Sequence, residues 1–212
     1  MEILPFCFPI PKLVRNIWAK TLKNENPVRY IDMTTTLPPN YQYTESIAVK
    51  DFFENYGENL LLRLVTSVKT LSRSTIRERS VNRPALAVTG YFKYFAHKRI
   101  QLFGAGEMAF FREQTPAKRS KVMDTMAAKR IPCVVVSRNL APTPEMIGIL
   151  EAKGIPLFRT SLTSKAFTTE VTVMLEERFA PRSTYHGTLL DVRGIGTLIR
   201  GDSGSGKSEA AL

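Results

Sequence analysis

The amino-acid sequence predicts an α/β protein, in which a small N-terminal βαβ domain with a parallel sheet is joined by a helix to the beginning of a second domain. Two observations predict this class. Apolar strand-like runs alternate with helical segments of about 11–15 residues, which is typical of parallel βαβ units. After Pro181 the pattern changes to short β-like runs. We therefore expect an irregular leader over 1–45, the α/β domain with its linker helix over 46–180, and an incomplete second domain over 181–212.

The first expected elements are short. Ile47–Tyr56 is expected as a helix and Leu60–Val65 as a strand, whereas the polar and basic segment Ser72–Arg83 is expected as a loop or an edge element. Pro84–Phe95 is a helix candidate, because proline is tolerated in the first turn of a helix.

The alternating segment that follows carries clear end signals. Thr115 is the expected cap before Pro116, Gly154 ends a helix, and Pro181 stops the linker helix. The expected strands are Arg99–Phe103, Ile131–Ser137 and Ile155–Arg159, and the expected helices are Pro116–Lys129, Thr143–Lys153 and Lys165–Phe179. Beyond them, Thr184–Val192 and Ile195–Arg200 are expected as two strands separated by a turn at Gly194.

The charge distribution leaves several kinds of partner open. The net charge is +11, and the segment from Arg73 to Arg130 holds 13 Lys and Arg residues against four acidic ones. Such a band is either a solvated basic face or a surface that attracts nucleic acid, an acidic protein or a phosphorylated ligand. Nucleic acid ranks low, because the band lacks the interleaved aromatic platform of single-strand binders.

Cysteine usage and hydropathy predict a cytoplasmic protein. Cys7 and Cys133 are far apart and form no disulfide framework, which favours a reducing compartment, and Cys133 is expected to be a buried small hydrophobe. The start of the chain lacks the basic region of a signal peptide. No apolar stretch approaches the roughly 18 residues of a membrane span, so no membrane association is expected.

A phosphate-binding motif lies near residue 212. The pattern G-x-x-x-x-G-K-[ST] is met by Gly201, Asp202, Ser203, Gly204, Ser205, Gly206, Lys207 and Ser208. Its glycines allow the backbone to wrap with its amides pointing at phosphate oxygens. Lys207 is expected to reach the β- and γ-phosphates of a nucleoside triphosphate, and the Ser208 hydroxyl to ligate Mg²⁺. The context fits, because a strand precedes the motif and Ser208–Leu212 is expected to start a helix.

His186 is the other polar candidate. It lies 15 residues before Gly201, on the expected strand that leads toward the motif. On spacing alone it is either a structural or exposed histidine, or a residue that faces the nucleotide phosphates.

These residues together resemble the HPr kinase/phosphorylase family. The segment Thr184–Val192 with its His186-Gly187 pair, and Gly201–Glu209, resemble the start of that family's catalytic domain. Arg83-Pro84, Thr89–Phe92, Arg99–Leu102 and Leu175–Arg178 resemble its N-terminal domain and linker helix. The resemblance covers about residues 46 to 212 and leaves the leader outside.

The resemblance implies a specific chemistry. Members of the family use ATP and Mg²⁺ to phosphorylate a serine of the phosphocarrier HPr of the sugar phosphotransferase system, and they remove that phosphate with inorganic phosphate, which yields pyrophosphate. They are homo-hexamers with the P-loop domain at the centre. On the matching positions, His186 and Lys207 take the catalytic places, Gly201–Ser208 the ATP site, and Ser208 the Mg²⁺ ligand.

One departure leaves alternatives open. The family's catalytic aspartate lies downstream of the P-loop, and no counterpart is present within these 212 residues. A P-loop without an acid–base group is expected to bind phosphate but to transfer it poorly. We therefore expect a fragment or a truncated product of such an enzyme. The alternatives are a non-catalytic nucleotide- or phosphate-binding regulatory module, an unrelated P-loop kinase, and a basic nucleic-acid-binding protein.

Overall fold

The computed structural model describes residues 2–5, 44–182, 184, 187–193 and 195–211. Two compact units are present, and Tyr43–Pro181 make up the larger one. Its centre is a five-stranded sheet in the order β3-β8-β7-β6-β5. The strands are β3 (Leu62–Leu64), β5 (Val81–Asn82), β6 (Ile100–Phe103), β7 (Val134–Val136) and β8 (Leu157–Thr160). The predicted α/β class is confirmed.

The sheet is mixed, which corrects the prediction of a parallel sheet. The pairs β5–β6, β6–β7 and β7–β8 are parallel, but β3 runs antiparallel to β8, with Leu62 opposite Thr160. The edge is fixed by a long-range bond, in which the buried Thr160 hydroxyl donates to the Leu60 carbonyl at 2.7 Å. Strand direction depends on such distant contacts, so the local apolar pattern could not predict it.

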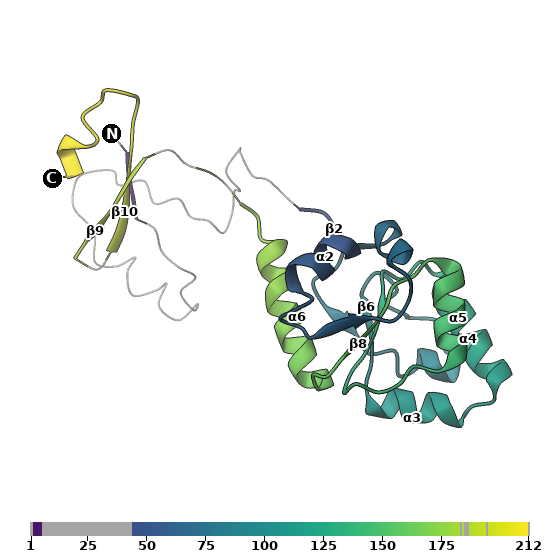
Figure 1. The fold of residues 1–212 in the computed structure, drawn as a ribbon. Helices are drawn as coiled ribbons and strands as arrows, with labels where there is room; N and C mark the ends of the chain where they lie inside the picture. The colour runs from purple at the N-terminus through teal and green to yellow at the C-terminus, as the bar shows by residue number, and fades with distance from the viewer. Residues whose placement is uncertain (1, 6–43, 183, 185–186, 194, 212) are drawn as a thin grey trace. The chain divides into compact units, whose positions relative to one another are not determined.

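Helices cover both faces of the sheet (Figure 1). The helices are α2 (Val49–Tyr56), α3 (Ala105–Glu113), α4 (Pro116–Ala128), α5 (Pro144–Lys153) and α6 (Ser164–Arg178). Along β6, Leu102 belongs to a core cluster with Phe52 and Phe167, while the next residue, Phe103, belongs to a second cluster with Met123. Because successive strand side chains point to opposite faces, α2 and α6 cover one face and α3, α4 and α5 the other.

Several helix ends follow the sequence signals. The Thr115 hydroxyl accepts from the Lys118 amide and the Thr143 hydroxyl from the Met146 amide, both at 3.4 Å, so each threonine caps a helix that begins with proline. Gly154 ends α5 with a φ of 68°, a left-handed conformation that glycine adopts without strain. The predicted cap at Thr115 and the predicted helix end at Gly154 are confirmed, whereas Thr143, expected as the first residue of its helix, is the cap before it.

The prediction of a helix over Pro84–Phe95 is wrong. Only a 3-10 turn, η2 (Ala87–Thr89), forms there. The Gln114 side-chain amide at the end of α3 donates to the Val88 carbonyl at 2.8 Å, and the chain turns at Gly90 with a φ of 101°. That carbonyl is therefore used by a distant side chain, and the helical pattern stops. A second 3-10 segment, η1 (Val68–Arg73), lies in the chain between β2 (Ile47–Ala48) and β4 (Thr75–Ile76), which pair as a two-stranded sheet.

The smaller unit contains a three-stranded antiparallel sheet in the order β1-β10-β9. Its strands are β1 (Glu2–Pro5), β9 (Thr188–Val192) and β10 (Ile195–Arg200). The expected pair of strands before the P-loop is thus present, and strand β1 is a regular element that was not expected within the irregular leader over 1–45. Ile3 and Leu4 stand opposite Ile199 and Leu198, so this short apolar stretch completes the sheet. Residues 6–43 of the expected leader lie outside the described residues.

None of the helices within the described residues combines the length and the apolar character that crossing a bilayer requires.

Candidate functional site

The glycine-rich loop Gly201–Ser208 follows directly on strand β10, as its sequence predicts. Leu198 and Ile199 near the end of this strand are buried, and the loop itself is exposed from Gly201 to Ser205. The packed strand therefore anchors one end of the loop, while the loop residues themselves remain exposed. This is the arrangement in which a strand presents a loop to a phosphate-bearing ligand.

The loop turns sharply at two glycines. Gly204 has a φ of 80° and Gly206 a φ of 75°, both in the left-handed region that residues with a Cβ adopt only at a cost. At Gly201 the constraint is steric, because a Cβ there would lie 2.7 Å from the Ser205 hydroxyl oxygen. The glycine spacing of the motif thus matches what this backbone requires.

The Lys207 side chain folds back over the loop. Its ammonium donates to the Gly201 carbonyl at 2.9 Å and to the Asp202 carbonyl at 2.6 Å. The positive charge is therefore held at the loop, where a phosphate group would lie. To bind a phosphate, the ammonium has to exchange one or both carbonyl acceptors for phosphate oxygens, and charge-assisted bonds of that kind are the stronger ones.

The segment after the loop also differs from its expectation. Ser208–Leu212 is expected to start a helix, but the structure has the single 3-10 turn η3 (Glu209–Ala211). The Ala210 amide donates to the Gly206 carbonyl at 2.9 Å and the Ala211 amide to the Ser208 carbonyl at 3.3 Å, so helical and 3-10 bonds mix in this turn. Within the described residues at this site, the groups that can bind phosphate are those of the loop and Lys207.

The donor set fits a phosphate group. Backbone amides of an exposed glycine-rich loop, an ammonium held against its carbonyls and the neighbouring Ser208 hydroxyl are the kinds of group that bind a nucleotide phosphate with its Mg²⁺. Within the described residues, no group of three or more His, Cys, Asp and Glu side chains is arranged to hold a metal ion. ATP, Mg²⁺ and the assigned roles of Gly201–Ser208 stay predictions.

His186 lies outside the described residues, and its catalytic role also stays a prediction. The glycine after it is close to strand β10, because a Cβ on Gly187 would lie 2.6 Å from the Ile199 carbonyl oxygen.

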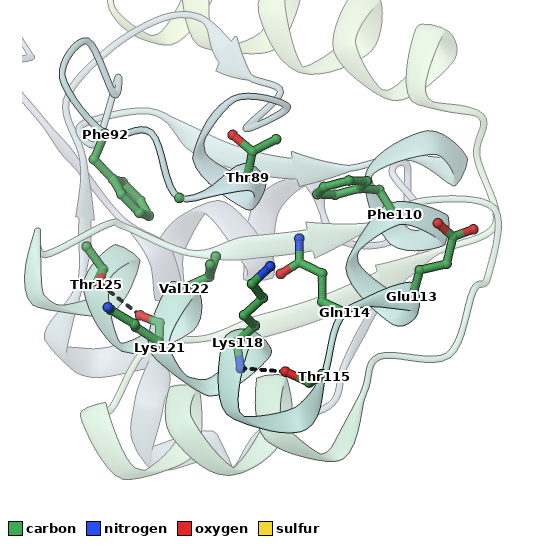
Figure 2. A pocket seen from close by; sticks show the side chains of 11 residues that line it. Thr89, Phe92, Phe110, Glu113, Gln114, Thr115, Lys118, Lys121, Val122 and Thr125 are labelled. Atoms are coloured by element: carbon green, nitrogen blue, oxygen red, sulfur yellow. Dashed lines mark hydrogen bonds between the residues drawn. The ribbon is translucent and has the colours of Figure 1, made fainter.

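A separate hollow of about 690 Å³ lies in the larger unit, between η2, α3 and α4. Figure 2 shows Phe92 and Phe110 on opposite sides of it, with Lys118 reaching in from α4. The lining mixes aromatic rings with Thr89, Gln114 and other polar side chains. Sequence reasoning missed this hollow: α4 was predicted, but α3 was left unassigned and the segment around η2 was misread as a helix.

Comparison with known proteins identifies both parts of the chain. The family model described as "HPr Serine kinase N terminus" matches residues 47–175, and the one described as "HPr Serine kinase C-terminal domain" matches residues 177–212. A protein named HPr kinase/phosphorylase from Caldicellulosiruptor bescii is 37% identical over 164 residues, which are 76% of this chain and 53% of that protein. One of the same name from Latilactobacillus sakei is 40% identical over 159 residues, which are 75% and 51% of the two chains.

The chain spans about half the length of these curated relatives. Among solved structures, the CBS and DRTGG domains of the regulatory region of Clostridium perfringens pyrophosphatase give a TM-score of 0.43 at 13% identity, covering 63% of this chain and 52% of that one.

Proposed function

The chain belongs to the HPr serine kinase family, and from that membership we propose that it carries the nucleotide-binding loop of an ATP- and Mg²⁺-dependent kinase/phosphorylase that acts on a serine of HPr. The observation that carries the proposal is the Gly201–Ser208 loop, in which Lys207 lies against the loop carbonyls. Family membership rests on matches to both the N-terminal and the C-terminal family models.

Each residue of the loop has a proposed task. The amides of Gly204 to Lys207 bind phosphate oxygens, Lys207 neutralises charge on the β- and γ-phosphates, and the Ser208 hydroxyl holds Mg²⁺. When bound, the metal ion draws charge from the phosphate oxygens. This chain's own residues fix the position of the triphosphate, and positioning with charge stabilisation supplies most of the acceleration in phosphoryl transfer.

His186 is proposed as a second catalytic residue. Support comes from its place in a segment that resembles the start of the family's catalytic domain, within the range of the C-terminal family match. The proposed partners of the reaction are HPr, inorganic phosphate and pyrophosphate. The proposed assembly is a homo-oligomer, with a hexamer as the leading state. The proposed compartment is the cytoplasm.

Phosphorylation of purified HPr tests the proposal. The product of the complete reading frame, supplied with radiolabelled ATP and Mg²⁺, should label a serine of HPr. Lys207→Ala should lower this activity by at least about tenfold, which corresponds to the loss of one charge-assisted bond. His186→Ala should lower the rate while ATP binding stays within about twofold.

Lys165→Ala is the matched control, because it removes an exposed lysine of α6. No transfer to HPr by the wild-type product, or full transfer by the Lys207→Ala protein, would refute the proposal.

A further inference from the structure

A cleft of about 460 Å³ lies in the larger unit where α4 and α5 end, beside the connection from η1 to β4. Six cationic residues line it: Arg73, Arg77, Lys98, Lys129, Arg130 and Lys153. No Asp or Glu is among the described residues that line it. We propose that this basic cleft binds a compact polyanion with two or more phosphate groups, at a site separate from the Gly201–Ser208 loop.

Its positive charge is poorly compensated. Lys153 lies 3.9 Å from Asp124, with both side chains about half exposed. Within the part of the chain that the structure describes, no ion pair is formed by the other five cations. Like charges gathered in a concave surface repel one another, so a bound anion would relieve an unfavourable arrangement.

Helix ends account for only part of this charge. Lys129 follows the last residue of α4, and Lys153 is the last residue of α5, where cations interact favourably with the negative end of the helix. Each helix end is equivalent to roughly half an elementary charge, so the two together balance about one cation. The charge of about four of the five cations that form no ion pair is therefore left unbalanced.

The backbone at Arg130 points to the same conclusion. Arg130 has a φ of 55° just beyond α4, and Gly154 has a φ of 68° just beyond α5. Glycine adopts this conformation freely, whereas a residue with a Cβ is strained in it. An arginine thus occupies a strained position at the rim of the cleft, although the neighbouring helix has glycine at the corresponding place.

The exposed side chain of Arg73 lies beside Gly154. A Cβ on Gly154 would lie 3.2 Å from Arg73 Cδ, so the arginine side chain rests on the glycine. A side chain at residue 154 would crowd Arg73, so the glycine leaves room for the arginine at the cleft.

The size of the cleft favours a small ligand. Its volume lies within the range of small-molecule sites, of about 300–1,000 Å³. Arg and Lys donors that converge on one cavity match a compact polyphosphate, whose several oxygens accept from many donors at once. A nucleic acid backbone would instead require a longer basic track.

Amide NMR titration of the ¹⁵N-labelled 212-residue chain with inorganic triphosphate tests the proposal, because it reports which residues bind. The amides of Lys129, Arg130 and Gly154 should shift and saturate with a Kd below about 1 mM. The double variant Arg73→Gln/Arg130→Gly should weaken this binding by at least about tenfold. Arg130→Gly alone should raise the melting temperature, so lost binding cannot be ascribed to unfolding.

The control variant Lys118→Gln/Lys121→Gln removes the same number of charges beside the hollow of Figure 2, and it should bind within about twofold of wild type. Shifts confined to Gly201–Ser208, or equal affinity in the Arg73→Gln/Arg130→Gly protein, would overturn the proposal. Two results would overturn the assigned ligand class. One is orthophosphate binding as tightly as triphosphate, and the other is a DNA duplex that displaces bound triphosphate at a concentration below that of the triphosphate.

Discussion

The Arg119 guanidinium donates to a Glu145 carboxylate oxygen at 2.7 Å and ties helix α4 to helix α5. Both side chains are largely shielded, with exposures of 15% and 17%. Arg119 also donates to the Gln114 carbonyl at 2.7 Å, so one side chain joins the end of α3 to both following helices. This contact fixes the relative position of the two helices whose ends form the basic cleft.

Replacing Glu145 by glutamine should lower the melting temperature at neutral pH. The hydrogen bond from Arg119 is the main cause that lowers the pKa of Glu145 from 4.5 to about 2. Because the folded-state pKa is the lower one, this stabilisation is present above about pH 4.5 and is lost as the pH falls toward 2. The difference in melting temperature between wild type and Glu145→Gln should therefore shrink over that range.

Glu54→Gln serves as the control for this prediction. Glu54 pairs with Lys50 at 3.8 Å on an exposed face of α2, and removing such a pair should change the melting temperature little. If Glu145→Gln and wild type differed by the same amount at pH 7 and at pH 2.5, the Arg119 contact would not be the source of the effect.

Gly104→Ala should destabilise the fold, because a Cβ at this position would lie 2.6 Å from the Ser164 hydroxyl and 2.9 Å from a Glu107 carboxylate oxygen. That buried carboxylate accepts from the Gly104 amide at 3.0 Å and pairs with Arg83 at 2.9 Å. We expect a loss of about 1–3 kcal/mol in unfolding free energy, measured in urea.

Gly106→Ala is the matched comparison, since a Cβ there meets no atom within 4 Å and Gly106 lies inside α3. This variant should be stabilised by about 0.5–1 kcal/mol. Equal effects of the two substitutions would contradict the steric account of Gly104.

Cys133 should resist alkylation in the native protein. Its side chain is fully buried, and burial raises the pKa of its thiol well above the ordinary value, so little reactive thiolate forms. Mass spectrometry after iodoacetamide treatment should find Cys133 unmodified in buffer and modified in urea. Rapid modification in buffer would contradict this account, because it would show that the Cys133 thiol, directly before strand β7, is accessible.

The sequence predicted those features that depend on neighbouring residues. Thr115 and Gly154 act within one turn of the helix that they cap, so their identity sufficed. Helix α3 was missed, because glycine is a weak signal at its cap and the carboxylate of Glu107 bonds to the Gly104 amide instead. The false helix at Pro84–Phe95 and the direction of β3 reflect contacts with distant residues.

The same distinction holds for the two candidate sites. The phosphate-binding loop is contiguous, so the motif Gly201–Ser208 could be recognised without a structure. The basic cleft could not, since Arg73, Arg130 and Lys153 come from three segments that the fold brings together. The only signal was the excess of positive charge between Arg73 and Arg130, and that excess did not indicate where the charges converge.

Calorimetric titration of the 212-residue chain with Mg²⁺-ATP tests the central claim most directly, because it depends on the Gly201–Ser208 loop and requires no catalysis. Wild type should bind nucleotide at the Gly201–Ser208 loop, and Lys207→Ala, which removes the ammonium now held by the Gly201 and Asp202 carbonyls, should bind it there at least about tenfold more weakly. Lys165→Ala should bind as wild type does. Equal affinity of wild type and Lys207→Ala would contradict the account.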